Sequence, residues 1–87
     1  MSVYAKGTQE VTTASILIAA ANPDRDGIHL TTNDANDVFV AFGEAAVVDE
    51  GVILAENVPV PVRGPLARRA VYGITGGGTS TVAFQEL

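Results

Sequence analysis

The chain has 87 residues, no cysteine, a single histidine and a formal net charge of −5. These values exclude a disulfide scaffold and a Cys/His zinc site, and the acidic balance argues against a nucleic-acid partner. A domain of this size buries only roughly 60–65% of the surface that its unfolded chain exposes, so we expect association with other subunits to add stability. Only 17% of the residues are charged, a low fraction that indicates a partly covered surface.

Residues 1–8 show no periodicity and are predicted to be a flexible arm before one β domain of residues 9–87. No signal pattern or membrane-length apolar run is found, so we expect synthesis in a cytoplasm and no membrane partner. The apolar residues 16–18 predict a strand, which ends at Asn22-Pro23 because proline forces the preceding residue out of the helical region. The next four residues, Asp-Arg-Asp-Gly, predict a polar turn.

The middle of the chain predicts two strands, at residues 27–33 and 37–42. In the first, Ile28 and Leu30 alternate with polar residues, which is typical of a strand with one face in a core. In the second, neither side is polar, as expected for a central strand covered on both faces. The Asn-Asp-Ala-Asn stretch between them favours a tight connection, so we expect an antiparallel hairpin.

The second half of the chain predicts several short strands. Residues 43–51 are expected to form a long connection and residues 52–55 a brief strand. In residues 58–62 valine alternates with proline, and because N–H groups two residues apart point to the same side, the prolines remove donors from one edge only. This pattern is typical of an edge strand protected against pairing on its open side.

Residues 70–75 and 79–87 flank a Gly-Gly-Gly turn and predict a C-terminal hairpin. Short strands at close spacing, separated by turns rich in Gly and Pro, predict an all-β fold. We expect a small antiparallel β-sandwich or jelly-roll-like barrel with a flexible N-terminal arm.

The candidate catalytic residues have simpler structural explanations. His29 stands on the outward face of its strand without a serine- or cysteine-centred motif, which favours a surface or interface residue over a catalytic base. Asp34 and Asp37 are expected to be exposed turn residues, since nothing nearby indicates the burial that would separate their pKa values. We therefore expect no enzymatic activity.

The candidate metal and phosphate sites are incomplete. Asp24, Asp26 and Gly27 resemble the start of a calcium loop, but no glutamate follows at its twelfth position. The glycines at residues 76–78 lack the lysine and the following helix of a phosphate loop. We expect no metal and no cofactor.

Positive charge clusters only at Arg63, Arg68 and Arg69. In an acidic protein such arginines more often balance nearby carboxylates. The alternative is that they meet acidic patches on a partner protein, because arginine is enriched in interfaces.

Several short motifs resemble small β-rich structural proteins of tailed-bacteriophage particles, of the capsid decoration, cement or head-fibre-base type. Glu56-Asn57 stand where a Pro-Gly pair is usual in that family. The similarity spans about residues 12–86, in the motifs Asn22-Pro23-x-Arg25-x-Gly27, Ile28-x-Leu30-Thr31, Asn36-Asp37-Val38-Phe39-Val40-Ala41-Phe42-Gly43, Gly51-Val52-x-Leu54, Gly64-Pro65-Leu66 and Ala70-Val71-Tyr72-Gly73-Ile74.

This resemblance implies a non-enzymatic virion protein, often a homotrimer, on the outer face of the capsid and bound to the major capsid protein. Such a protein stabilises the shell by binding the assembled form and not its free subunits. We expect two contact regions. The subunit interface is predicted at Val58, Pro59, Val60, Pro61 and Val62, and the capsid contact at Val3, Tyr4, Lys6, Arg68 and Arg69.

Two other classes of function remain open at this stage. A carbohydrate- or receptor-binding module of a virion fibre or tail would suit a sandwich, although sugar platforms usually expose aromatic rings and this chain has no tryptophan. A small hydrolase would need a nucleophile and a base in one cleft, and the sequence shows neither.

Overall fold

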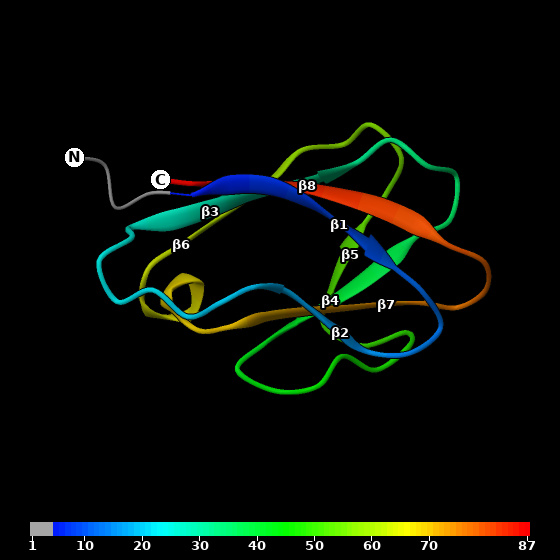
Figure 1. Cartoon of the computed structure of the whole chain (residues 1–87), viewed down its shortest axis with the longest axis horizontal. Coiled ribbons are helices and arrows are strands. Elements are labelled where there is room, and N and C mark those ends of the chain that lie inside the picture. Colours follow the sequence, from blue (N-terminus) through cyan, green and yellow to red (C-terminus); the bar gives the residue numbers. More distant parts are fainter. Residues whose placement is uncertain (1–4) are drawn as a thin grey trace.

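Two antiparallel four-stranded sheets face each other in the computed structural model, which describes residues 5–87 (Figure 1). Sheet A has the order β1-β8-β3-β6 and sheet B the order β2-β7-β4-β5. The elements are β1 (Lys6–Val11), β2 (Ile16–Ala19), β3 (Gly27–Thr32), β4 (Val38–Phe42), β5 (Val52–Leu54), β6 (Val60–Arg63), the 3-10 turn η1 (Pro65–Arg68), β7 (Val71–Thr75) and β8 (Ser80–Glu86).

The strand order is that of a jelly roll. Strands β1 and β8, β2 and β7, β3 and β6, and β4 and β5 pair antiparallel, as in one long hairpin with its turn between β4 and β5. This hairpin is rolled so that β3 also pairs with β8 and β4 with β7, which completes the two sheets. The predicted all-β sandwich is therefore confirmed, in its jelly-roll form.

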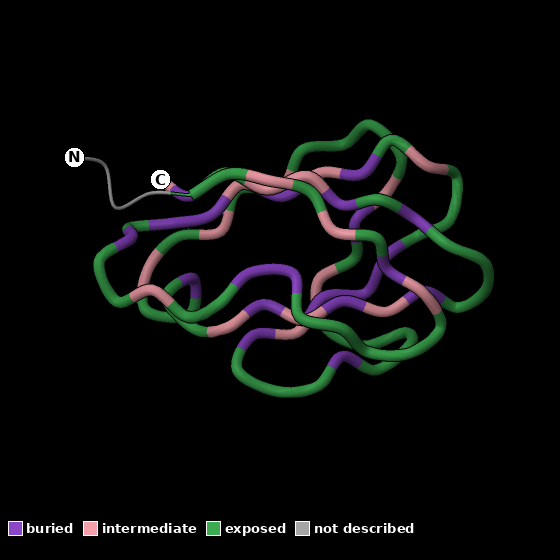
Figure 2. The backbone as a smooth tube through the Cα atoms, viewed as in Figure 1, coloured by how far each residue is buried: buried purple, intermediate pink, exposed green. Residues whose placement is uncertain are grey.

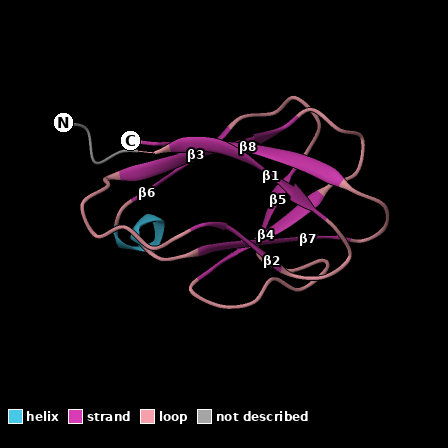
Figure 3. Cartoon of the chain, in the orientation of Figure 1, coloured by secondary structure: helices cyan, strands magenta, loops and turns pink. Residues whose placement is uncertain are grey.

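The two predicted hairpins are wrong. Strands β3 and β4 lie in different sheets, and so do β7 and β8. The connections after β3 and β7 cross from one sheet to the other, as Figure 3 shows, and do not turn back within a sheet. Alternation of apolar residues sets which face of a strand is buried, but it does not identify the neighbouring strand.

The domain begins earlier than predicted. Residues 1–4 of the predicted arm lie outside the described residues, but Lys6, Gly7 and Thr8 belong to β1 and pair with β8. Ala5 is also held, because its C=O accepts the Glu86 N–H at 2.9 Å and its N–H donates to the Glu86 carboxylate at 2.6 Å. Residues 6–8 are therefore part of the sheet and not of an arm.

The core lies between the sheets, where the inward residues of both layers meet (Figure 2). In β4, Val38, Val40 and Phe42 belong to this core. Phe39 points to the opposite face and is nevertheless only 8% exposed. The prediction of a central strand with apolar cover on both faces is confirmed at this residue.

Strand β6 is an edge strand of sheet A, as predicted, and pairs only with β3. The Gly64 N–H donates to the Asp26 C=O at 3.1 Å on the β3 side. Since N–H groups two residues apart point the same way, those of Val60 and Val62 also face β3, and the nitrogen of Pro61 lies at the open edge. Proline therefore removes a donor where another strand could otherwise pair.

Candidate interaction surface

The outer faces of the two sheets differ in polarity. Outward residues of sheet A are mostly polar or charged, and cross-strand neighbours on it include Lys6, Gln85 and His29. The outward positions of sheet B alternate with its core residues and carry no charge. We call the latter surface the apolar face; it comprises Leu17, Phe39, Ala41, Ile53, Tyr72 and Ile74.

The long connection of residues 43–51 extends this apolar surface. It contains no helix, and its Ala46 is buried, with an N–H that donates to the Ser15 hydroxyl at 2.9 Å. A Cβ placed on Gly76 would lie 3.6 Å from Val48 and 3.8 Å from Phe39, so Val48 lies beside the apolar face. Large apolar side chains remain accessible here, because Ile53 is 52% exposed and Leu17 42%.

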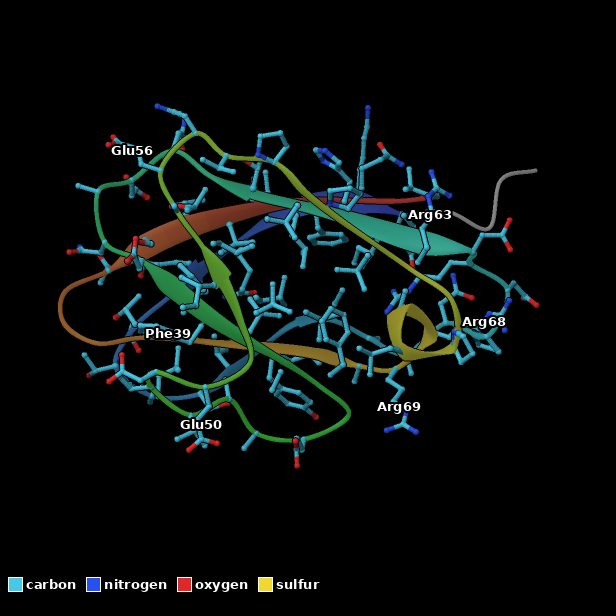
Figure 4. All side chains as sticks on the ribbon, turned by 180° about the vertical axis from the view of Figure 1, so that it is seen from behind. Phe39, Glu50, Glu56, Arg63, Arg68 and Arg69 are labelled. Carbon is cyan, nitrogen blue, oxygen red and sulfur yellow. The ribbon has the colours of Figure 1, made fainter. Side chains whose placement is uncertain are left out.

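The three arginines predicted to cluster lie at one end of the molecule. Figure 4 shows Arg63, Arg68 and Arg69 together at the η1 end and Glu56 at the opposite end. Arg68 lies 3.9 Å from Asp26, which agrees with a charge-balancing role for that residue. Within residues 5–87, Arg63 and Arg69 form no ion pair with a carboxylate.

The predicted contact residues are only partly available to a partner. Val60 and Val62 pack against the core, whereas Val58, Pro59 and Pro61 are exposed. Of the predicted capsid contacts, Lys6, Arg68 and Arg69 are exposed. Val3 and Tyr4 lie outside the described residues.

The residues considered as catalytic or metal-binding candidates form hydrogen bonds within the fold or belong to no metal-binding cluster. One Asp34 carboxylate oxygen accepts the Thr81 N–H at 2.6 Å, which fastens the loop to β8. The Asn22 side chain accepts the Asp24 N–H at 3.0 Å, as in an Asx turn. In residues 5–87 no three His, Asp or Glu side chains lie close enough to hold a metal ion, and no helix could span a membrane.

Sequence reasoning missed a buried ion pair at the η1 end. Arg25, which lies in the predicted polar turn, is 0% exposed, and its guanidinium lies 2.6 Å from the Glu86 carboxylate. The same guanidinium donates to the backbone C=O groups of Ala67, Ala20 and Arg69. It joins the turn before β3, the η1 segment and the end of β8. Nothing in the sequence indicates that a charged residue in an Asp-rich turn is buried.

The environment of Glu86 changes its pKa in two opposing ways. Burial raises the pKa because it disfavours the charged form, whereas hydrogen bonds from Arg25, the Ala5 N–H and the Asn22 amide stabilise the carboxylate. The hydrogen bonds outweigh burial, and the pKa of Glu86 is lowered from its usual value of 4.5. Since no buried side-chain nitrogen or oxygen within residues 5–87 lacks a hydrogen-bond partner, this cluster has no buried polar group left over for a ligand and stabilises the fold.

Comparison of the chain with protein-family models, with curated proteins and with solved structures finds no match.

Proposed function

We propose that this chain is a non-enzymatic structural protein of a tailed-phage virion. It binds the outer surface of the assembled capsid as a homotrimer, with the major capsid protein as its partner, and stabilises the shell. The sequence motifs that resemble decoration proteins motivate this proposal. The jelly roll, a fold that viral capsid proteins share with lectins and cupins, is compatible with it.

The observation that carries the proposal is the contrast between the two outer faces. Large apolar side chains that stay exposed together on one side of a small domain mark sites of protein contact. Here Ile53, Leu17 and Val48 are each more than a third exposed on or beside one sheet. The opposite sheet carries polar side chains that suit the solvent-facing side of a shell protein.

A stabilising role needs only binding, because a protein that binds the shell and not its free subunits adds its binding free energy to the stability of the shell. A trimer multiplies this effect, since three weak contacts on a site of matching symmetry act together. The apolar face is our candidate for the capsid contact, together with Arg68 and Arg69. Lys6 lies on the outward face of sheet A and is therefore left out of this contact. The exposed residues Val58, Pro59 and Pro61 remain the candidate subunit contact.

The carbohydrate-binding alternative has less support. Sugar platforms present exposed aromatic rings, whereas Phe39 and Phe42 are buried here, and Tyr72 and Phe84 are partly buried. We therefore retain one proposed function.

Two measurements test this proposal. Light scattering on the purified protein should give three times the mass of the chain. Electron cryomicroscopy of particles made with and without the gene should then show trimeric density on the outer shell only when the gene is present. A particle surface that is identical in both preparations would overturn the proposal.

A further inference from the structure

A groove of about 300 Å³ lies between β4 and the connection of residues 43–51. Its wall is mainly apolar and includes Ala41, Phe42, Val47 and Leu66, with Glu44 and Glu50 as the charged residues. Val47 is 49% exposed and Leu66 46%, so two large apolar side chains at this groove face solvent. Its lining contains no basic residue.

The backbone of β4 is open at this groove. The Gly43 N–H donates to the Ala70 C=O at 2.7 Å on the β7 side. Successive residues of an antiparallel strand direct their N–H and C=O groups to alternate sides, so those of Phe42 point to the β5 side. Strand β5 begins only at Val52, which lies opposite Val40.

The residues just before β5, which would pair with Phe42 if the strand began earlier, turn away from it. Asp49 and Gly51 have φ values of 68° and 83°, and the Glu50 N–H donates to the Val47 C=O at 3.1 Å. Glu50, which would face Phe42 in a longer β5, is therefore engaged in a turn. Nothing in residues 5–87 forms a hydrogen bond with the N–H or C=O of Phe42 along this edge.

An unpaired donor and acceptor beside an apolar groove form a site where an extended peptide can add to the sheet. The peptide backbone would bond to Phe42, and alternate side chains would point into the groove or toward its rim. Since the lining carries two carboxylates and no cation, charge complementarity selects a peptide with Lys or Arg beside small apolar residues.

We propose that this groove is a strand-addition site for an extended, basic and apolar segment of a partner protein. The proposal does not depend on virion function, because it rests on the Phe42 backbone, the apolar lining, and Glu44 and Glu50. If the proposed function holds as well, a terminal arm of a shell subunit is the expected source of such a segment.

The test uses the isotope-labelled full chain and a synthetic peptide, acetyl-Val-Lys-Val-Lys-Val-amide, followed by NMR. Titration should shift the Phe42 amide saturably. At a peptide concentration ten times the Kd, only about one tenth of the protein is free. Exchange of the Phe42 N–H with solvent should therefore slow about tenfold. A peptide of the same length with Glu in place of Lys, and one N-methylated along its backbone, should leave the Phe42 amide unchanged.

Matched variants separate the role of charge from a general loss of fold. Glu44→Gln combined with Glu50→Gln should weaken binding of the lysine peptide about three- to tenfold, because two partly solvated ion pairs are lost. Glu56→Gln removes an exposed carboxylate that does not line the groove and should leave the affinity unchanged.

Three results would overturn the proposal. The first is a Phe42 amide that does not respond to millimolar lysine peptide. The second is equal binding of the lysine and glutamate peptides. The third is protection of the Phe42 amide that grows with protein concentration in the absence of peptide, because a second copy would then be the occupant.

Discussion

Arg25 and Glu86 form an ion pair of 2.6 Å although 61 residues separate them in the chain. Both are almost fully buried, and the guanidinium also bonds three backbone C=O groups. Removal of Arg25 leaves the buried Glu86 carboxylate without its ion-pair partner, a loss that typically costs about 3–5 kcal/mol. We expect Arg25→Met to lower the free energy of unfolding by this amount, as measured by urea denaturation.

The matched control is Arg63→Met, at an exposed arginine with no ion pair among residues 5–87. Its effect should stay within about 0.5 kcal/mol, as is usual for surface substitutions. The proposed role of Arg25 would be wrong if the two variants had equal stability.

The lowered pKa of Glu86 makes stability depend on pH in a defined direction. In the unfolded chain Glu86 titrates near 4.5, above its pKa in the fold, so the unfolded state binds more protons between the two values. The contribution of this carboxylate is therefore complete above about pH 4.5 and is lost as the pH falls through the folded pKa. Denaturation at a series of acidic pH values should show this loss.

Glu86→Gln removes the titration, so the difference in stability between wild type and variant should shrink as the pH falls below 4.5. Glu56→Gln, at an exposed carboxylate, should leave the wild-type pH profile in place. A difference between wild type and Glu86→Gln that is constant with pH would contradict the assignment.

Gly51 permits the turn that leaves Phe42 unpaired. Its φ is 83°, and a Cβ at this position would lie 2.3 Å from the Val40 carbonyl oxygen. Alanine would combine an unfavourable backbone conformation with a clash against backbone, so Gly51→Ala should cost about 2–4 kcal/mol in thermal or chemical denaturation. Gly77→Ala is the control, because a Cβ at Gly77 would have no heavy atom within 4 Å outside its chain neighbours. Equal stability of the two variants would refute this account of Gly51.

Ile53 tests the apolar face. It lies opposite Phe39 and is 52% exposed, so Ile53→Lys should change the free energy of unfolding by no more than about 0.5 kcal/mol. The same variant should lose occupancy on particles, because a charge would enter the proposed contact. Thr8→Lys, at an exposed position of sheet A, should bind particles as wild type does. Full occupancy of Ile53→Lys would remove this face from the proposed function.

Truncation tests where the domain begins. Deletion of residues 1–8 removes the pairs of Lys6, Gly7 and Thr8 with β8, and it also removes Ala5, which bonds Glu86 at 2.6 Å. It should therefore lower the midpoint of urea denaturation, whereas deletion of residues 1–4 leaves these contacts in place. Identical midpoints for the two truncations would show that residues 5–8 contribute nothing to the fold.

The predicted strands and their buried faces could be read from local pattern. Ile28 and Leu30 are fully buried, and the alternation in residues 58–62 indicated the edge strand β6, in which Pro61 lies toward the open side; Val58 and Pro59 precede this strand. Pairing could not be read in this way, because an alternating strand can satisfy its N–H and C=O groups with any neighbour of matching register. The neighbours of β3 proved to be β6 and β8, and not β4.

The candidate site was less accessible to sequence reasoning than the fold. Leu17, Ile53 and Ile74 are apolar like core residues, and only the assembled sheets show that they point outward. The open edge at Phe42 likewise depends on where β5 begins and on the turn at Gly51.

Composition and local periodicity by themselves determined an acidic β protein with short strands, no disulfide and one proline-protected edge, because these properties depend on residue type and on spacing along the chain. Only the tertiary structure decided that the long hairpin rolls into a jelly roll, that Arg25 is buried against Glu86, and that one sheet keeps an apolar outer face. Each of these depends on contacts between residues far apart in sequence, and burial of a side chain is set by what packs over it as well as by its own chemistry.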